Sequence, residues 1–166
     1  MEDDRHLPAN LVLVSEAPGK HLKFDPNYRA LYCYPKGCAG ARLREMMGLS
    51  SGEYLALRRI NVLDHYLGTV SPGSRFPMAE ARRAAEAKRH KLFGSNALFV
   101  GWRAATAFGL QGDVLKWHLG EAFTWAVVPH TSGVNRWWND PANRAAGEAF
   151  LARVAEQVRT GAQSFR

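Results

Sequence analysis

The chain has few cysteines and no long hydrophobic segment. Only two of its 166 residues, Cys33 and Cys38, are cysteines. Two thiols are too few for a disulfide framework or for a four-thiolate zinc or iron–sulfur site. No apolar run approaches the roughly 20 residues that cross a bilayer, and the acidic start MEDDRH lacks the apolar core of a signal peptide. We therefore expect a cytoplasmic protein with no membrane partner.

Acidic residues are also scarce relative to basic ones. The sequence has 15 Asp and Glu against 22 Lys and Arg, a formal net charge of +7. This surplus favours a polyanionic partner, nucleic acid before an anionic membrane, although a solvated basic surface gives the same count. Hydrophobic residues make up 46% and charged residues 22% of the chain, an ordinary globular composition. We expect residues 1–166 to form a single domain with its own core.

Four short apolar or β-branched runs are the clearest structural signals. They are Leu11–Ser15, Leu57–Val62, Ala97–Gly101 and Thr124–Pro129. Three of them are nearly continuous in apolar character, which is typical of strands covered on both faces in a parallel sheet.

Helical patterns lie between and after these runs. They cover Ala39–Met47, Pro77–Phe93, Trp102–Phe108 and a long amphipathic stretch from Pro141 onward. Asp140 precedes the last pattern and fits a helix N-cap. The alternation of strand and helix predicts an α/β fold, with three α/β/α layers around a central, mainly parallel four-stranded sheet.

Polar residues follow each of the four runs. They are Glu16-Ala17-Pro18-Gly19, then Asn61 with Asp64 and His65, then Trp102-Arg103, and last His130-Thr131-Ser132-Gly133. In open α/β sheets, ligands bind outside the carboxyl ends of the strands. Each of these residues alone fits a cap or a turn, but their joint placement predicts a ligand site.

The same blocks occur in an order typical of one family. They read SEAPG, YPKGCAGARLREMMG, RRINVL, ALFVGWRAATAFG and PHTSG, from about Leu11 to Asn139. This series resembles the uracil-DNA glycosylase superfamily, and most of all its iron–sulfur type, which has a Gly-Glu-Ala-Pro-Gly turn after the first strand. The resemblance implies base excision by a monomer in the nucleoid, which hydrolyses the N-glycosidic bond of a uracil or modified pyrimidine flipped out of DNA.

Two catalytic roles follow from the resemblance. Glu16 matches the carboxylate near C1′ that positions the attacking water and stabilises the developing sugar cation. His130 matches the donor to the base O2 oxygen, where negative charge develops in the transition state. Neither role calls for a metal or a cofactor.

The resemblance also implies a base pocket. Asn61 matches the residue whose amide reads the Watson–Crick edge of the flipped base. Tyr34, with Tyr32 as the alternative, matches the aromatic ring that stacks on the base. Ala17 and Gly19 lie in the turn that brings backbone amides to it. A turn residue or a core side chain is the competing interpretation at each position.

The loop after His130 matches the segment that the family inserts into the duplex. Ser132 would hold a phosphate and Gly133 would allow the tight turn. A wedge would come from Val134, Asn135, Arg136 or Trp137, whereas Trp138 is expected to be buried. The tract EARRAAEAKRHK adds a basic face that could meet phosphates, or a solvated helix surface.

The sequence departs from the family pattern in several places. The iron–sulfur type needs four cysteines, so no cluster is expected here. Ser15 stands where glycine is usual, and Thr131 where proline is usual. From Asn61 the chain reads NVLDHYLG, which places Asp64 and His65 near the predicted base pocket. A carboxylate at Asp64 would favour an amino or hydroxyl donor on the base.

The departures leave the substrate open. One alternative is a glycosylase for a modified cytosine in phage DNA, acting in antiviral defence. A second is a non-catalytic DNA-binding protein on the same fold. A third, a small-molecule nucleotide hydrolase, is disfavoured by the basic charge and by the lack of a P-loop or GxGxxG turn.

Overall fold

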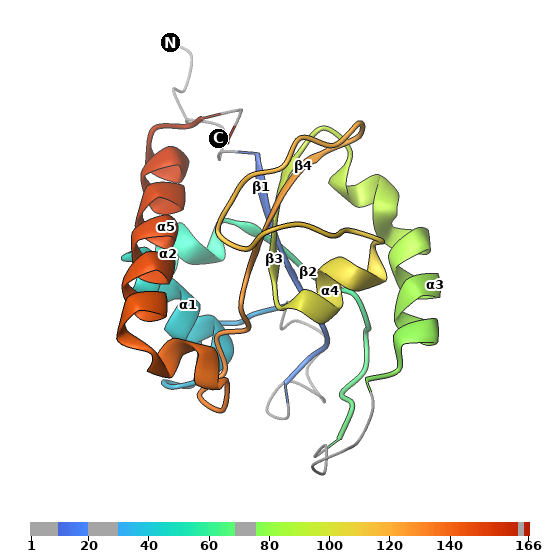
Figure 1. The fold of residues 1–166 in the computed structure, drawn as a ribbon, viewed down its shortest axis with the longest axis horizontal. Helices are drawn as coiled ribbons and strands as arrows, with labels where there is room; N and C mark the ends of the chain where they lie inside the picture. Colours follow the sequence, from blue (N-terminus) through green and yellow to red (C-terminus); the bar gives the residue numbers. More distant parts are fainter. Residues whose placement is uncertain (1–9, 20–29, 69–75, 163–164) are drawn as a thin grey trace.

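A computed structural model describes residues 10–19, 30–68, 76–162 and 165–166. Its centre is a sheet of four parallel strands in the order β2-β1-β3-β4 (Figure 1). The strands are β1 (Leu11–Ser15), β2 (Arg58–Asn61), β3 (Asn96–Val100) and β4 (Thr124–Val128). This confirms the predicted parallel sheet, and each strand ends within one residue of its predicted position.

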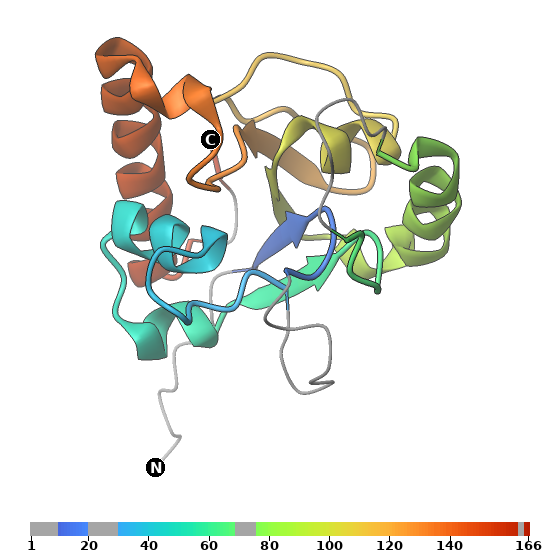
Figure 2. The ribbon, with the colours of Figure 1, turned by 90° about the horizontal axis from the view of Figure 1, so that it is seen from below.

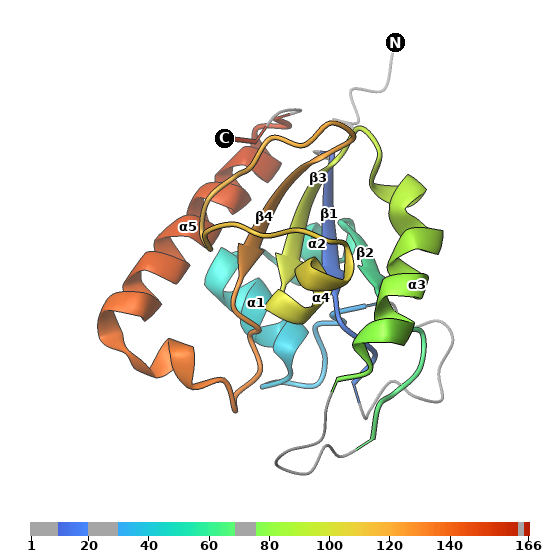
Figure 3. The same cartoon turned by 45° about the vertical axis from the view of Figure 1, so that its right-hand side comes forward.

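Helices cover both faces of the sheet, as predicted (Figures 1 and 3). One face carries α1 (Ala39–Met47), α2 (Ser51–Leu55) and α5 (Pro141–Arg159). The other carries α3 (Met78–Lys88) and α4 (Trp102–Ala107). Figure 2, seen from below, shows the sheet between these two helical layers.

The alternation of side chains along β1 explains why its sequence is continuously apolar. Leu11 and Leu13 pack with α1 and α5, while Val12 and Val14 pack with α3 and α4. All four side chains are buried. A strand covered on both faces needs an apolar residue at every position.

Helix α1 begins and ends where predicted, and α5 begins where predicted. Helix α1 is capped by the Cys38 side chain and ends at Gly48, which has a φ of 67°. Helix α5 starts after Asp140, whose carboxylate accepts hydrogen bonds from the backbone N–H groups of Ala142 and Asn143.

Three elements differ from the prediction. The expected helix Pro77–Phe93 is α3 followed by a separate 3-10 turn, η2 (Arg89–Leu92). Helix α2 was not predicted, because five residues are too few to show a period. The 3-10 turn η3 (Arg136–Asn139) was not predicted either.

The segment before β4 shields the outer edge of that strand. The Leu115 N–H donates to the carbonyl of Val127, and His118 and Trp125 exchange backbone hydrogen bonds in both directions. Edge strands left open invite pairing with other chains, so this cover protects β4. It also brings the preceding residues to the carboxyl edge of the sheet. Within the described residues, no helix combines the length and apolar character needed to span a membrane.

Candidate active site at the carboxyl edge of the sheet

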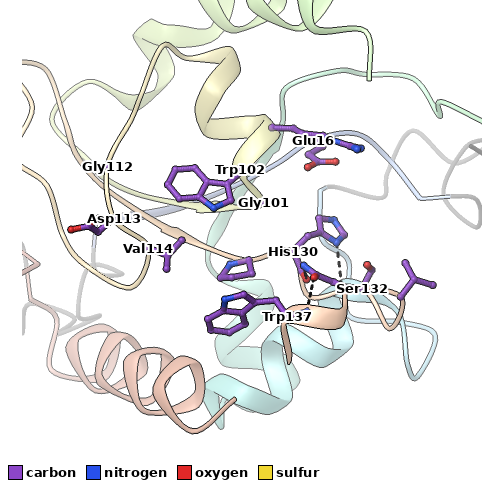
Figure 4. A pocket seen from close by; sticks show the side chains of 13 residues that line it. Glu16, Gly101, Trp102, Gly112, Asp113, Val114, His130, Ser132 and Trp137 are labelled. Carbon is purple, nitrogen blue, oxygen red and sulfur yellow. Dashed lines mark hydrogen bonds between the residues drawn. The ribbon is translucent and has the colours of Figure 1, made fainter. Parts of the chain in front are cut away.

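The two predicted catalytic side chains meet beside Gly101, at the end of β3. A Cβ atom built on Gly101 would lie 2.7 Å from Glu16 Oε1 and 3.4 Å from His130 Cδ2. Gly101 has a φ of 106°, so only glycine fits this position without strain. Both side chains therefore lie in van der Waals contact range of one point, and Figure 4 shows the Glu16 carboxylate pointing toward the His130 ring.

A large opening, here called the main cavity, surrounds this pair. Its volume is about 780 Å³. It is lined by Glu16, Gly101, Trp102, Arg103, Gly112, Asp113, Val114, Pro129, His130, Ser132, Val134, Asn135 and Trp137 (Figure 4). These residues come from the ends of β1, β3 and β4 and from the segment that shields β4, so the parallel topology itself assembles the cavity.

Burial changes the pKa of the Glu16 carboxyl group. Removal from water raises its pKa, because the charged form loses solvation, and the nearby Arg103 guanidinium partly opposes this. The backbone N–H of Leu63 donates to the Glu16 carbonyl at 2.9 Å. Glu16 is thus a partly desolvated carboxylate, a stronger base than an exposed glutamate.

The His130 ring is held in one neutral form. The backbone N–H of Ser132 donates to Nδ1 at 3.1 Å, so the ring proton is on Nε2 and that atom is the free donor. Burial lowers the pKa of His130, and the charge of Arg103 lowers it further. A neutral imidazole with a free Nε2–H suits a group that donates to developing negative charge.

The backbone of His130 is anchored as well. Its carbonyl accepts hydrogen bonds from Asn135 Nδ2 at 2.9 Å and from Trp138 Nε1 at 3.1 Å. Trp138 packs on the hydrophobic core but is only partly buried, less than the sequence predicts. These two hydrogen bonds therefore fix the backbone that carries the imidazole ring.

A second, smaller opening, here called the tyrosine pocket, shares His130 with the main cavity. Its volume is about 120 Å³, several times the space that one water needs. It is lined by Ser15, Ala17, Gly19, Leu31, Tyr32, Tyr34, Pro35, Cys38, Ala39, Gly40 and His130. The predicted base-binding residues Ala17, Gly19 and Tyr34 thus share one pocket with a catalytic candidate.

Both candidate stacking rings belong to the tyrosine pocket. The rings of Tyr32 and Tyr34 lie 5.6 Å apart at 56°. Tyr34 is half exposed, and its hydroxyl donates to Ser51 Oγ at 2.9 Å. The ring of Tyr34 is therefore the more exposed of the two, and its hydroxyl is held by the hydrogen bond to Ser51.

Asn61 lies opposite Ser15 in the sheet. Its side-chain Oδ1 is buried and has no hydrogen-bond partner among the described residues. Asn61 lines neither the main cavity nor the tyrosine pocket, but Ser15 beside it lines the latter. A buried acceptor without a donor is costly, so this atom calls for a partner that the described part of the chain does not supply.

Asp64 lies apart from both cavities. Its carboxylate pairs with Lys88 Nζ at 2.6 Å, and the Asp64 side chain is 85% exposed. His65 points to Glu80 on α3 at 3.6 Å. The structure thus directs both residues toward α3 rather than toward Glu16 and His130.

The loop after His130 contributes to the main cavity at several points. Ser132, Asn135 and Trp137 line it, and Trp137 packs edge-on against Trp138 at 4.7 Å. Val134 is 88% exposed at the tip of this loop, and Arg136 is exposed at the start of η3. Val134 is therefore the most exposed apolar side chain of this loop.

In the basic tract EARRAAEAKRHK, some cations bond to other segments of the chain and others lie exposed on the surface. Lys88 donates to the carbonyls of Asn61 and Val62 at 2.8 and 3.0 Å. Arg89 donates to the carbonyl of Phe108. These two cations fasten α3 and η2 to neighbouring segments, and the exposed Arg82 and Arg83 remain at the surface.

Sequence reasoning missed part of the site. It placed Trp102 and Arg103 at this edge without a role, and it did not foresee Gly112–Val114 at all. These three residues lie in irregular chain between α4 and β4 and carry no periodic signal of their own. Only the pairing of residues 115–118 with β4 brings them to the cavity.

Comparison of the chain with models of known protein families and with curated proteins finds no match. The similarity to the uracil-DNA glycosylase superfamily therefore stays a prediction from the ordered blocks. Among residues 10–19, 30–68, 76–162 and 165–166, no group of three or more His, Cys, Asp or Glu side chains is arranged to hold a metal ion. The fold and the cavity together describe an α/β protein with a carboxylate–imidazole pair at the carboxyl edge of its sheet.

Proposed function

We propose that the chain is a monofunctional DNA glycosylase that hydrolyses the N-glycosidic bond of a flipped-out uracil or modified pyrimidine and leaves an abasic site. The observation that carries the proposal is the meeting of Glu16 and His130 beside Gly101 inside the main cavity. A DNA-binding module needs neither group at this point.

The proposed reaction uses each group once. The bond between C1′ and the base nitrogen breaks, and its electron pair leaves with the base. His130 Nε2–H donates to the base oxygen that takes up this charge. Glu16 stabilises the sugar cation, orients a water toward C1′ and accepts the proton that the water releases. The sugar gains a hydroxyl group, and the free base is protonated from solvent.

The electrostatics of the site favour this division of roles. Arg103 lies at the same cavity and lowers the pKa of both Glu16 and His130. It therefore favours an ionised carboxylate and a neutral imidazole together, which is the pair of states that the mechanism requires.

The tyrosine pocket is the proposed site of the base. It adjoins His130 and offers two aromatic rings for stacking. Asn61 lies beside Ser15 of this pocket, and its Oδ1, which has no partner among the described residues, would accept from an N–H donor on the Watson–Crick edge of a base that reaches it. Uracil N3–H and the amino group of a cytosine both satisfy that requirement.

The test is release of free bases from DNA, measured by mass spectrometry on a mixed set of uracil-containing, deaminated and phage-modified duplexes. We expect one pyrimidine to be released and abasic sites to accumulate. Glu16→Gln and His130→Ala should each remove most of this activity, by about 10²-fold or more.

Matched controls are available on the surface. Glu121→Gln and His90→Ala make the same chemical changes at exposed positions and should retain full activity. Undiminished excision by well-folded Glu16→Gln and His130→Ala proteins would refute the proposal. Salt-sensitive DNA binding without release of any base would instead support a non-catalytic DNA-binding protein.

A further inference from the structure

A third cavity lies behind the loop that follows His130. This cavity, here called the arginine pocket, has a volume of about 110 Å³. It is lined by Arg42, Glu45, Met46, Thr131, Ser132, Gly133, Asn135, Trp138, Asn139 and Arg144. Ser132 and Asn135 also line the main cavity, so the loop is a shared wall between the two.

The arginine pocket presents donors that the described chain leaves unused. The Arg42 guanidinium makes no hydrogen bond or ion pair with the described residues, and the same holds for the Ser132 hydroxyl. Arg144 donates one hydrogen bond, from Nε to Glu148 Oε1 at 2.9 Å. The one acidic lining residue, Glu45, has Arg44 at 4.0 Å as a partner.

Gly133 shapes the pocket around Arg42. A Cβ atom built on Gly133 would lie 2.5 Å from Arg42 Nη1. The guanidinium, at the end of an exposed and flexible side chain, therefore lies beside the loop backbone. A planar cation held beside a hydroxyl and a second guanidinium is the donor set that recognises a phosphate.

We propose that the arginine pocket binds a backbone phosphate of the DNA strand whose flipped nucleotide has its base in the tyrosine pocket and its sugar beside Glu16 in the main cavity, with Arg42 as the principal ligand of the phosphate. This inference rests on the proposed function for the identity of the strand. The shared wall of Ser132 and Asn135 separates the two sites by the thickness of one loop, which suits a phosphate near the extruded nucleotide. The donors then fix the strand in position and read no sequence.

The first experiment measures the affinity for unmodified duplex DNA over a range of salt concentrations. Each phosphate contact contributes about 0.9 to the slope of log K against log [salt]. We expect Arg42→Gln to lower the slope by about that amount and Arg42→Lys to keep it. The control is Arg153→Gln, which removes the same charge from the surface of α5 and should leave the slope unchanged.

The second experiment locates the phosphate. Duplexes that carry the released base receive one uncharged methylphosphonate linkage at a time, on either side of the target nucleotide. One linkage should weaken binding by the wild-type chain and have no further effect on Arg42→Gln. Equal sensitivity of the two proteins at every linkage would overturn the proposal.

The outcomes separate this inference from the proposed function. Normal base release with an unchanged salt slope in Arg42→Gln refutes the phosphate site and leaves the glycosylase intact. A lowered slope in a protein that releases no base supports the phosphate site and refutes the glycosylase. Absence of DNA binding by the wild-type chain refutes both.

Discussion

At the scale of single residues, burial of Glu16 makes its ionised form, which the proposed reaction uses, unfavourable for the stability of the fold. Its raised pKa means that the folded chain holds the carboxyl proton more tightly than the unfolded chain does. The stabilisation from this proton is complete below the unfolded pKa of about 4.3 and is lost as the pH rises through the folded pKa. Above that range the fold must keep a poorly solvated charge.

We therefore expect Glu16→Gln to raise the melting temperature at pH 8 and to have little effect at pH 4. A gain of about 1 kcal/mol corresponds to about 2–4 °C for a chain of this size. Thermal unfolding at the two pH values measures the difference, with Glu121→Gln as the exposed control. A lower melting temperature for Glu16→Gln at pH 8 would show that the carboxylate stabilises the fold.

Arg103 is the second residue whose effect has a definite sign. It lowers the pKa of Glu16 and of His130, so its removal raises both. If activity needs ionised Glu16 and neutral His130, Arg103→Gln should move the acidic limb of the pH–rate profile to higher pH. The move should shrink at high salt, because Arg103 is exposed. Arg103→Lys should restore the profile, and an unmoved limb in Arg103→Gln would exclude an electrostatic role.

The sequence indicates some of these residues and not others for a physical reason. Glu16 and His130 each directly follow a buried strand, so the parallel topology alone brings them together. Asp64 also follows a strand, but Lys88 on α3 draws its carboxylate outward. An ion pair between residues far apart in the chain leaves no local signal.

At the scale of elements, the packing of α5 on η3 supports the site from behind. Gly147 is buried in the middle of α5, and a Cβ atom there would lie 2.4 Å from the Trp138 ring. Alanine is favoured over glycine in a helix by about 1 kcal/mol, but overpacking costs about 1–3 kcal/mol. Trp138 in turn holds the His130 carbonyl.

Gly147→Ala should therefore destabilise the protein by up to about 2 kcal/mol and also reduce activity. Ala149→Gly, at an exposed position of the same helix, should cost about 1 kcal/mol and leave activity unchanged. Thermal unfolding and base release on the same samples compare the two variants. A Gly147→Ala protein that is more stable than the wild type would mean that Trp138 moves aside freely.

Element prediction from sequence succeeds where burial is uniform and fails where tertiary contacts decide. Strand β1 is covered on both faces, so its apolar run is unmistakable. Residues 115–118 are held against β4 by backbone hydrogen bonds of Leu115 and His118, but Leu115 has a φ of 58° and the segment forms no regular strand. Their sequence alternates apolar and polar residues, so it is the contacts with β4, and not the pattern, that decide the conformation.

At the scale of the whole molecule, the excess positive charge is not all available to a partner. Lys88 joins the end of β2 to α3 through two carbonyls and Asp64, and its side chain is only 14% exposed. The sequence shows the cations but not which of them the fold uses. Nor does the sequence show the strand order β2-β1-β3-β4, in which β2 and β3, consecutive in the chain, are separated by β1.

Lys88→Gln should thus lower the free energy of unfolding by about 1.5–3 kcal/mol, because the lost hydrogen bonds involve a charged donor. Arg82→Gln, on the exposed side of the same helix, should leave stability within about 0.5 kcal/mol of the wild type. Chemical denaturation measures both. Equal stability of the two variants would show that Lys88 contributes no more to the free energy of unfolding than an exposed arginine does.

The hydrogen bond from the Ser132 backbone to His130 Nδ1 has a consequence for how this protein tolerates change. Many histidines owe their tautomer to a neighbouring acidic side chain, which one substitution can delete. Here the orienting group is a peptide amide, which every amino acid except proline provides. Substitution of the side chain at position 132 can therefore change the contacts with a ligand while the proton of His130 stays on Nε2.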